Sequence, residues 1–265
     1  MIRICLAGAT GVVGRALVPA IRGSKGLRLV SAVSRSNGGR DLGLVLGIPG
    51  LSLTISPSVA EALETKADVL VDFTSPGAVR SHVLLAVRNG VNVVIGTSGL
   101  TDADHREVDR EAKKHKVGVV AAGNFAVSAV LAEYFALTAA KYLHSWEIIE
   151  YALDTKPDAP SGTSRELVHA LSGVRRPKVL IPVGKTYGDP RSRGSPLDGT
   201  QIHSVRLPGP MVGIEAIFGR EGERLTIRHE AGRDAGPYVN GVLLAIRKAP
   251  TFVGLKQGLW KIMDV

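Results

Sequence analysis

Short apolar segments alternate with amphipathic ones through about the first 122 residues of the chain. The apolar segments are rich in Val and Ile with little polar alternation, which is typical of strands buried on both faces of a sheet. We expect strands at residues 2–7, 27–33, 67–73, 92–97 and 118–122. Helices are expected at residues 12–22, 59–65, 77–88 and 102–115, the last with Thr101 as its N-cap. The pattern predicts an α/β fold with a Rossmann-type, doubly wound parallel sheet.

The pattern changes after Asn124. Beyond it we expect a long apolar helix at 126–143, a strand at 146–153, and a loop with the start of a helix at 156–163. Strands are then expected at 203–206, 214–218 and 224–229, and a final helix at 238–248. The three later strands are spaced like an antiparallel sheet. Residues 175–200 are rich in Gly, Pro and basic residues and predict a long loop or flap. We expect one domain of residues 1–123, to which 236–265 return, and a second, α+β domain of residues 124–235.

Composition indicates a globular protein of 265 residues with a 45% hydrophobic and 22% charged content, enough for two lobes. No apolar run reaches the roughly 18 residues of a transmembrane helix, and the opening residues are typical of a strand rather than of a signal peptide. We therefore expect a cytoplasmic protein without a membrane partner. The single cysteine, Cys5, excludes an internal disulfide and argues against a thiolate metal cluster. No histidine pair has metal-ligand spacing, so no metal is expected; those considered are His105, His115, His144, His169, His203 and His229.

The net charge of +9 and the pI of about 9.8 require that nucleic-acid binding be considered. The basic residues are scattered, with no run of five, and aromatic residues are only 5%, too few for base-stacking platforms. We expect no nucleic-acid partner. A basic surface also suits a protein that attracts a phosphate-rich cofactor and a carboxylate substrate.

A glycine-rich turn joins the first predicted strand to the first predicted helix and fits the pattern G-x-x-G-x-x-G. Glycines at such a turn let the backbone approach a pyrophosphate, which the free N–H groups of the helix start then bind. The turn lies in the required strand–turn–helix context at the start of the sheet. It predicts a dinucleotide site whose residues are Gly8, Ala9, Thr10, Gly11, Val12 and Val13.

The end of the second predicted strand bears on the choice of nicotinamide cofactor. A carboxylate there would bind the ribose hydroxyls, but the chain has Ser34, Arg35 and Ser36 instead. Arg35 can pair with a 2′-phosphate, and both serine hydroxyls can donate to it. We therefore expect NADPH to be preferred, with NADH as the other candidate.

Four segments carry a resemblance to a known family: residues 72–74 (DFT), 96–99 (GTSG), 124–127 (NFAV) and, above all, 156–163 (KPDAPSGT). In order and spacing, from Gly8 to about Gly241, the chain resembles the dihydrodipicolinate reductases. The resemblance implies a Rossmann lobe, a substrate lobe that also forms a homotetramer, and NAD(P)H-dependent reduction of a cyclic imine dicarboxylate in lysine and diaminopimelate biosynthesis. It also implies further cofactor-binding residues, namely Phe73, Gly96, Thr97, Ser98, Ala122, Asn124 and Phe125.

The chemistry of the 156–163 segment supports this assignment. Ser161, Gly162 and Thr163 open a predicted helix, where free N–H groups and the Thr163 hydroxyl make an anion site suited to a substrate carboxylate. Hydride addition to a C=N carbon leaves negative charge developing on nitrogen. The nearby Lys156 ammonium can stabilise that charge and deliver a proton, which makes Lys156 the candidate catalytic residue.

The chain departs from the family pattern ahead of the lysine. The family has a Glu, a small residue and two adjacent histidines, whereas here Glu150 and Tyr151 are followed by Ala152 and Leu153, which have no hydrogen-bonding side chain. Glu215 replaces another family histidine, and the family's arginine corresponds to Arg233.

Three interpretations remain open from the sequence. The chain reduces the usual substrate with Lys156 and the anion site alone, at a lower rate. Alternatively, the more apolar pocket serves another C=N heterocycle, such as a pyrroline or a dihydropterin-like ring. In the third, the protein binds NADPH but has lost the chemistry.

Overall fold

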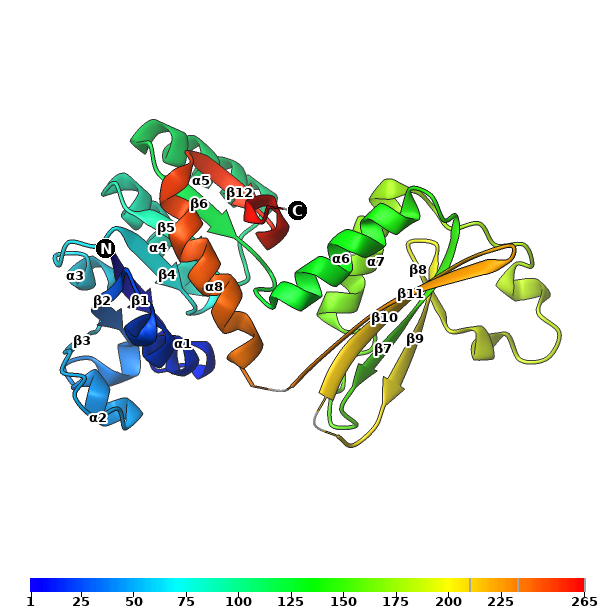
Figure 1. Cartoon of the computed structure of the whole chain (residues 1–265), viewed down its shortest axis with the longest axis horizontal. Coiled ribbons are helices and arrows are strands. Elements are labelled where there is room, and N and C mark those ends of the chain that lie inside the picture. Colours follow the sequence, from blue (N-terminus) through cyan, green and yellow to red (C-terminus); the bar gives the residue numbers. More distant parts are fainter. Residues whose placement is uncertain (210, 233, 265) are drawn as a thin grey trace. The chain divides into compact units, whose positions relative to one another are not determined.

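The computed structural model describes residues 1–209, 211–232 and 234–264. The chain forms two compact units, the first made of residues 1–127 and 234–265 and the second of residues 128–233 (Figure 1). The last α-helix of the chain thus belongs to the first unit. Arg233, the predicted counterpart of the family's arginine, lies outside the described residues. Within the described ranges, no helix is both long and apolar enough to cross a membrane.

The first unit is built on a seven-stranded sheet in the order β12-β6-β5-β4-β1-β2-β3, in which neighbouring strands run parallel. Its strands are β1 (Ile2–Ala7), β2 (Leu27–Val33), β3 (Ile55–Ser56), β4 (Val69–Asp72), β5 (Asn92–Ile95), β6 (Gly118–Ala121) and β12 (Gly254–Gln257). The prediction of a doubly wound parallel sheet is confirmed. The two edge strands β3 and β12 were not predicted, because β3 has only two residues and β12 contains the polar Lys256 and Gln257 and so lacks an apolar run.

Helices cover both faces of this sheet (Figure 1). They are α1 (Val12–Gly23), α2 (Leu42–Leu46), α3 (Val59–Ala62), α4 (Pro76–Arg88), α5 (Asp102–His115) and α8 (Gly236–Lys248). Thr101 caps α5 as predicted, in a capping box with Asp104. Short 3₁₀ turns lie at Arg35–Asn37, Ala249–Thr251 and Leu259–Ile262.

The strand order reverses between β1 and β4, which lie side by side. In open parallel sheets, ligands bind outside the carboxyl ends of the strands at such a reversal. The loops after β1 and β4 therefore begin at one place on the sheet edge, and the Phe73 amide donates to the Ala7 carbonyl there over 3.1 Å.

The second unit is a five-stranded sheet in the order β11-β10-β7-β9-β8, with helices α6 and α7 packed on one face. The elements are α6 (Val127–Ala140), β7 (Ser145–Ala152), α7 (Gly162–Val174), β8 (Ser195–Leu197), β9 (Thr200–Arg206), β10 (Met211–Arg220) and β11 (Glu223–Gly232). Along β7, buried and half-buried residues alternate, so Trp146, Ile148, Glu150 and Ala152 face the helices. Trp146 and Ile148 belong to the core of this unit together with Phe218.

One expectation about the second unit was wrong, and another was incomplete. The sheet is mixed rather than antiparallel, since β7 pairs parallel with β9. Parallel neighbours need a long crossover, and α7 with the segment that follows it supplies one. That segment is also not a simple loop, because it contains 3₁₀ turns at Val183–Lys185 and Pro190–Arg193 and the strand β8.

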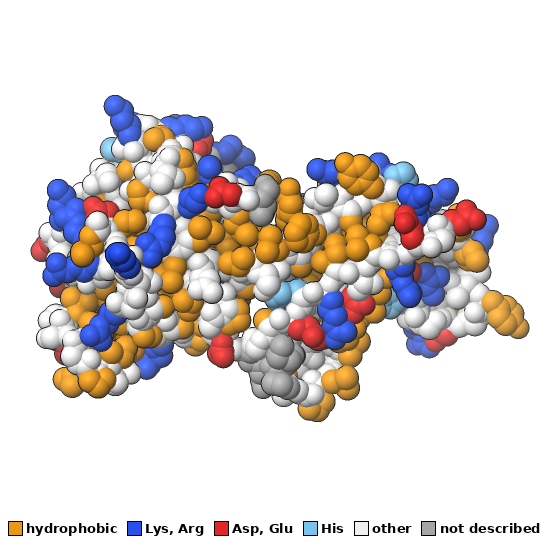
Figure 2. Space-filling model, in the orientation of Figure 1, with side chains coloured by type: hydrophobic (Ala, Val, Ile, Leu, Met, Phe, Trp, Pro, Cys, Tyr) orange, Lys and Arg blue, Asp and Glu red, His pale blue; other side chains and the backbone are white. Residues whose placement is uncertain are grey.

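Figure 2 shows Lys and Arg side chains spread over the visible face of the molecule, interspersed with other types. This distribution agrees with the scattered basic residues of the sequence. It differs from the single basic stripe by which a nucleic-acid-binding surface is recognised.

Candidate functional site

The glycine-rich turn between β1 and α1 packs tightly against the end of β4. Gly8 has a φ of +82°, and a Cβ added there would overlap the Phe73 carbonyl. A Cβ on Gly14 would overlap the Gly8 carbonyl. In α1, all of whose residues are described, the N-cap Gly11 offers no side-chain cap and the first turn has no acidic residue. The first amides of α1, including those of Val12 and Val13, therefore have neither an intrahelical nor a capping side-chain acceptor and suit an anion.

The end of β2 lies beside this turn. The Gly8 and Ala9 amides donate to the Val33 carbonyl over 3.0 and 3.1 Å. The hydroxyl oxygens of Thr10 and Ser34 lie 2.7 Å apart. The structure thus brings the predicted turn and the predicted nucleotide-selecting segment together.

The charged residues that directly follow β2 are basic. Arg35 is exposed, and Arg40 donates to the Asn37 side chain over 2.9 Å, while Asn37 donates to the Ser36 hydroxyl over 3.2 Å. The next carboxylate along the chain, Asp41, accepts hydrogen bonds from the amides of Leu44 and Leu53 and caps α2. It is therefore already engaged in holding its own loop.

A buried carboxylate of the 72–74 segment, to which no role was assigned from the sequence, connects the ends of β4 and β5. Asp72 is fully buried, and its Oδ1 accepts from the hydroxyls of Thr74 and Thr97 over 2.7 and 2.6 Å. Its Oδ2 lies 2.8 Å from Nδ1 of His82 in α4, a histidine that the sequence analysis also did not consider. The available signal was an acidic residue ending the otherwise apolar strand Val69–Asp72.

The other residues predicted to bind the cofactor also meet in the first unit. The rings of Phe73 and Phe125 are 5.6 Å apart, and a Cβ on Gly96 would overlap the Phe73 ring. Asn124 accepts from the Ala126 amide over 2.8 Å, and the Ala122 amide donates to the Ile95 carbonyl. Ser98 is exposed in the loop after β5.

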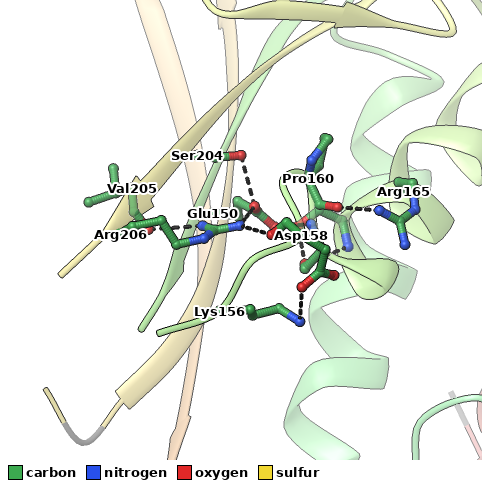
Figure 3. A network of polar contacts seen from close by, with 10 residues as sticks. Glu150, Lys156, Asp158, Pro160, Arg165, Ser204, Val205 and Arg206 are labelled. Carbon is green, nitrogen blue, oxygen red and sulfur yellow. Dashed lines mark hydrogen bonds and ion pairs between the residues drawn. The ribbon is translucent and has the colours of Figure 1, made fainter. Parts of the chain in front are cut away.

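In the second unit, a network of polar contacts surrounds Glu150 (Figure 3). Glu150 is 1% exposed. Its Oε2 accepts from the Ser161 amide over 2.8 Å and from the Ser164 hydroxyl over 2.6 Å. Its Oε1 accepts from the Ser204 hydroxyl over 2.8 Å and from Arg206 over 2.5 Å. One carboxylate therefore joins β7, β9 and the start of α7.

These donors decide the charge of Glu150. Burial by itself opposes ionisation, but the hydrogen bonds from Ser161, Ser164 and Arg206 outweigh it and lower the pKa of Glu150 to about 2. The carboxylate is therefore ionised throughout the neutral range. As an acceptor without a proton, it is unsuited to act as a general acid.

The loop before α7 contains the predicted catalytic lysine. Lys156 Nζ lies 2.6 Å from Asp158 Oδ1, and the lysine side chain is 36% exposed. The hydrogen bond from Lys156 lowers the pKa of Asp158, so the lysine has an ionised partner. Arg206 reaches the same loop by donating to the Asp158 carbonyl over 2.7 Å, and Arg165 donates to the Pro160 carbonyl (Figure 3).

Ser161 is the N-cap of α7, and its side chain accepts from the Ser164 amide. In this structure the Ser161 amide is engaged by Glu150. Gly162 and Thr163 take the next two positions, where helix geometry supplies no intrahelical acceptor for the amides. These two amides suit an anion.

The departures from the family pattern fall in different places. Ala152 is 8% exposed on the helix-covered face of β7, and the Leu153 carbonyl accepts from the Lys156 amide over 3.1 Å. Ile214 pairs with Glu150, whereas its neighbour Glu215 pairs with Ile149. Glu215 therefore lies on the opposite face of the sheet from the Glu150 network.

Comparison with known proteins covers nearly the whole chain. The family model described as "Dihydrodipicolinate reductase, N-terminus" matches residues 2–125, and "Dihydrodipicolinate reductase, C-terminus" matches residues 127–265. A protein of Desulfitobacterium hafniense named 4-hydroxy-tetrahydrodipicolinate reductase is 41% identical over 99% of both chains. One of Bacillus cytotoxicus with the same name is 38% identical, again over 99% of both.

Solved structures agree with these matches. The dipicolinate-bound dihydrodipicolinate reductase from Paenisporosarcina sp. TG-14 is 32% identical and superimposes with a TM-score of 0.88, covering 99% of this chain and 100% of that one. An amine dehydrogenase from Mycobacterium smegmatis has a TM-score of 0.67 at 17% identity and covers 96% and 94% of the two chains. The second likeness concerns the fold alone.

The lowered pKa of Glu150 predicts a defined pH dependence of stability. A depressed carboxyl pKa stabilises the fold above the unfolded-state value of 4.5, and this contribution is lost as the pH falls toward about 2. We expect the difference in unfolding free energy between wild type and Glu150→Gln to be constant above about pH 5. It should shrink by about 2 kcal/mol by pH 3, as urea unfolding at several pH values would measure. A difference that stays constant down to pH 3 would contradict the assignment.

Proposed function

The chain belongs to the dihydrodipicolinate reductase family, and from this premise we propose that it reduces 4-hydroxy-tetrahydrodipicolinate to tetrahydrodipicolinate with a nicotinamide cofactor, in lysine and diaminopimelate biosynthesis. The observation that carries the proposal is the 156–163 segment. It combines a lysine held by an ionised partner with a helix start whose amides suit a carboxylate.

The first unit fits a dinucleotide. Gly8 and Gly14 have no room for a Cβ, and the start of α1 lacks a capping carboxylate, which leaves its amides for the pyrophosphate. Phe73, Gly96, Thr97, Asn124 and Phe125 would hold the nicotinamide and its ribose. A bound nicotinamide supplies the hydride.

The second unit provides groups for the substrate. We propose that the amides of Gly162 and Thr163, with the Thr163 hydroxyl, bind a substrate carboxylate. Ser161 caps the helix beside them, and its amide donates to Glu150 and its hydroxyl to Ser164. Loss of the 4-hydroxyl group as water leaves a conjugated C=C–C=N ring. Hydride addition to carbon 4 of that ring moves an electron pair onto the nitrogen, and uptake of one proton completes the conversion. The Lys156 ammonium stabilises the negative charge that develops on the ring nitrogen and donates the proton.

The missing histidines concentrate this chemistry on Lys156. Neither Ala152 nor Leu153 can exchange a proton or donate a hydrogen bond. Asp158, whose pKa is lowered by the hydrogen bond from Lys156, keeps an ionised counterion beside the lysine. The predicted consequence is a slower enzyme, since general acid–base assistance contributes about 10² to 10⁴-fold.

We also propose NADPH as the preferred cofactor and a homotetramer as the assembly. The basic segment with Arg35 and the engagement of Asp41 elsewhere support the first proposal. The second is supported by the face of the second sheet opposite α6 and α7, which presents the half-buried Ile149 and Ile217 and the exposed Thr226.

Arg35→Ala should reduce the preference for NADPH over NADH about tenfold or more, because it removes a charged partner of the 2′-phosphate. The measurement is titration of each cofactor, followed by nicotinamide fluorescence. Arg28→Ala is the matched control, since it removes an exposed arginine at the opposite end of β2. Equal wild-type affinity for the two cofactors, together with no effect of Arg35→Ala, would refute the NADPH preference.

Lys156→Ala should lower kcat by about 10² or more while the NADPH dissociation constant stays within about twofold, because the lysine acts on the substrate. The assay is NADPH oxidation with 4-hydroxy-tetrahydrodipicolinate and a panel of cyclic imines, including a pyrroline and a dihydropterin. Lys185→Ala, an exposed lysine of the same unit, is the control.

A double variant, Ala152→His with Leu153→His, completes this experiment. It should raise turnover of 4-hydroxy-tetrahydrodipicolinate, provided that thermal unfolding shows an intact fold. If the double variant is less active on this substrate, and the wild type prefers another imine of the panel, that imine is favoured as the native substrate. No turnover of any substrate despite NADPH binding would identify a non-catalytic protein.

Light scattering should give a mass of about four times the 27.9 kDa of one chain at micromolar concentration. Ile217→Asp should yield a smaller species, because it puts a charge on the proposed contact face. Leu44→Asp, which changes an exposed apolar residue of the first unit, should leave the assembly unchanged. A monomeric wild type would rule the tetramer out.

A further inference from the structure

We propose that Glu150 is a positioning residue that places both the Lys156 loop and the anion-binding start of α7, without touching the substrate itself. The inference rests on the proposed function for the identity of the ligand. It rests on this chain's own contacts for the positioning.

The hydrogen bonds that Glu150 accepts from the protein leave it no role in direct contact with the substrate. The side chain is 1% exposed, and each oxygen accepts two hydrogen bonds from the protein. A carboxylate so enclosed has no oxygen turned toward a ligand. Its influence must pass through the groups that donate to it.

Two of those donors lie on either side of the proposed carboxylate site. The Ser161 amide and the Ser164 hydroxyl both donate to Oε2, and the residues between them are Gly162 and Thr163. Fixing residues 161 and 164 to one atom limits the orientations available to the two amides between them. The amides of Gly162 and Thr163 are thereby oriented before a ligand arrives, which reduces the entropic cost of binding.

Glu150 also supplies what the sequence of α7 lacks. A capping box places Glu or Gln three residues after the N-cap, but this helix has Ser164 there and no acidic residue in its first turn. The carboxylate comes instead from β7, a neighbour in space. The start of α7 is therefore oriented by the sheet of the second unit.

Arg206 makes this arrangement compatible with an anionic substrate. An unpaired carboxylate at the start of α7 would repel a substrate carboxylate, but the Arg206 guanidinium, 17% exposed, pairs with Oε1 at 2.5 Å. The same guanidinium nitrogen donates to the Asp158 carbonyl, and the Asp158 side chain holds Lys156 (Figure 3). Glu150 is thus connected to the lysine through Arg206 and Asp158. Through Ser161 and Ser164 it is connected to the proposed carboxylate site at the start of α7.

The test is binding of dipicolinate, followed by calorimetry in the presence of NADPH. Glu150→Gln should weaken dipicolinate binding about tenfold or more and raise KM, with NADPH affinity within about twofold of wild type. Because Glu150→Gln leaves Arg206 unpaired and risks misfolding, a matched pair of milder variants accompanies it.

Ser164→Ala and Ser204→Ala each remove one hydroxyl donor to the same carboxylate, the first from α7 and the second from β9. Positioning through α7 predicts that Ser164→Ala weakens dipicolinate binding about three- to tenfold and Ser204→Ala less than twofold. Equal losses in the two variants, or wild-type dipicolinate affinity in a folded Glu150→Gln protein, would overturn the proposal.

Hydrogen exchange separates this inference from the proposed function. Amides of residues 158, 159 and 161–166 should exchange at least tenfold faster in Ser164→Ala, and in folded Glu150→Gln, than in wild type. Ser204→Ala should resemble wild type. If exchange is faster in these variants but the wild type does not bind dipicolinate, the positioning role is upheld and the proposed substrate is refuted. Unchanged exchange in Ser164→Ala would refute the positioning.

Discussion

The charge of Glu150 can be buried only because four donors converge on it, and the ligand-binding part of the second unit is arranged by that requirement. An ionised carboxyl group away from water is costly unless its oxygens are hydrogen-bonded and its charge is paired. Here the donors come from β9, from the N-cap of α7 and from the first turn of α7. Satisfying the carboxylate therefore brings a strand, a helix start and the lysine loop into one arrangement.

The first unit uses a buried carboxylate in a similar way. Asp72 ends β4 and holds the residues that follow β4 and β5 through Thr74 and Thr97, with His82 on its other oxygen. Glycines complete the arrangement where backbone or ring atoms come too close for a Cβ, as at Gly8 and Gly96. In both units, a buried carboxylate holds the loops in place, and the groups proposed to contact a ligand come from those loops.

The departures from the family pattern are of unequal importance. Glu215 lies on the sheet face opposite Glu150 and bonds to Tyr151, so its change from histidine does not alter the lysine loop. Ala152 and Leu153 directly precede that loop and remove two groups able to exchange protons. The chain therefore retains the means to bind a carboxylate and to hold one charged lysine, with fewer groups for proton transfer.

The sequence by itself determined the parallel sheet and the glycine turn, because apolar runs and glycine spacing report local geometry directly. It identified the lysine segment through the resemblance of residues 156–163 to the family. It also determined the helix limits where caps are local, as at Thr101. Only the tertiary structure decided which donors satisfy Glu150 and Asp72, that β9 runs parallel to β7, and that β12 completes the first sheet. Those features join residues far apart in the chain, such as Glu150 with Arg206. No local pattern encodes them, because the cost of burying a charge is met by whichever donors folding brings near.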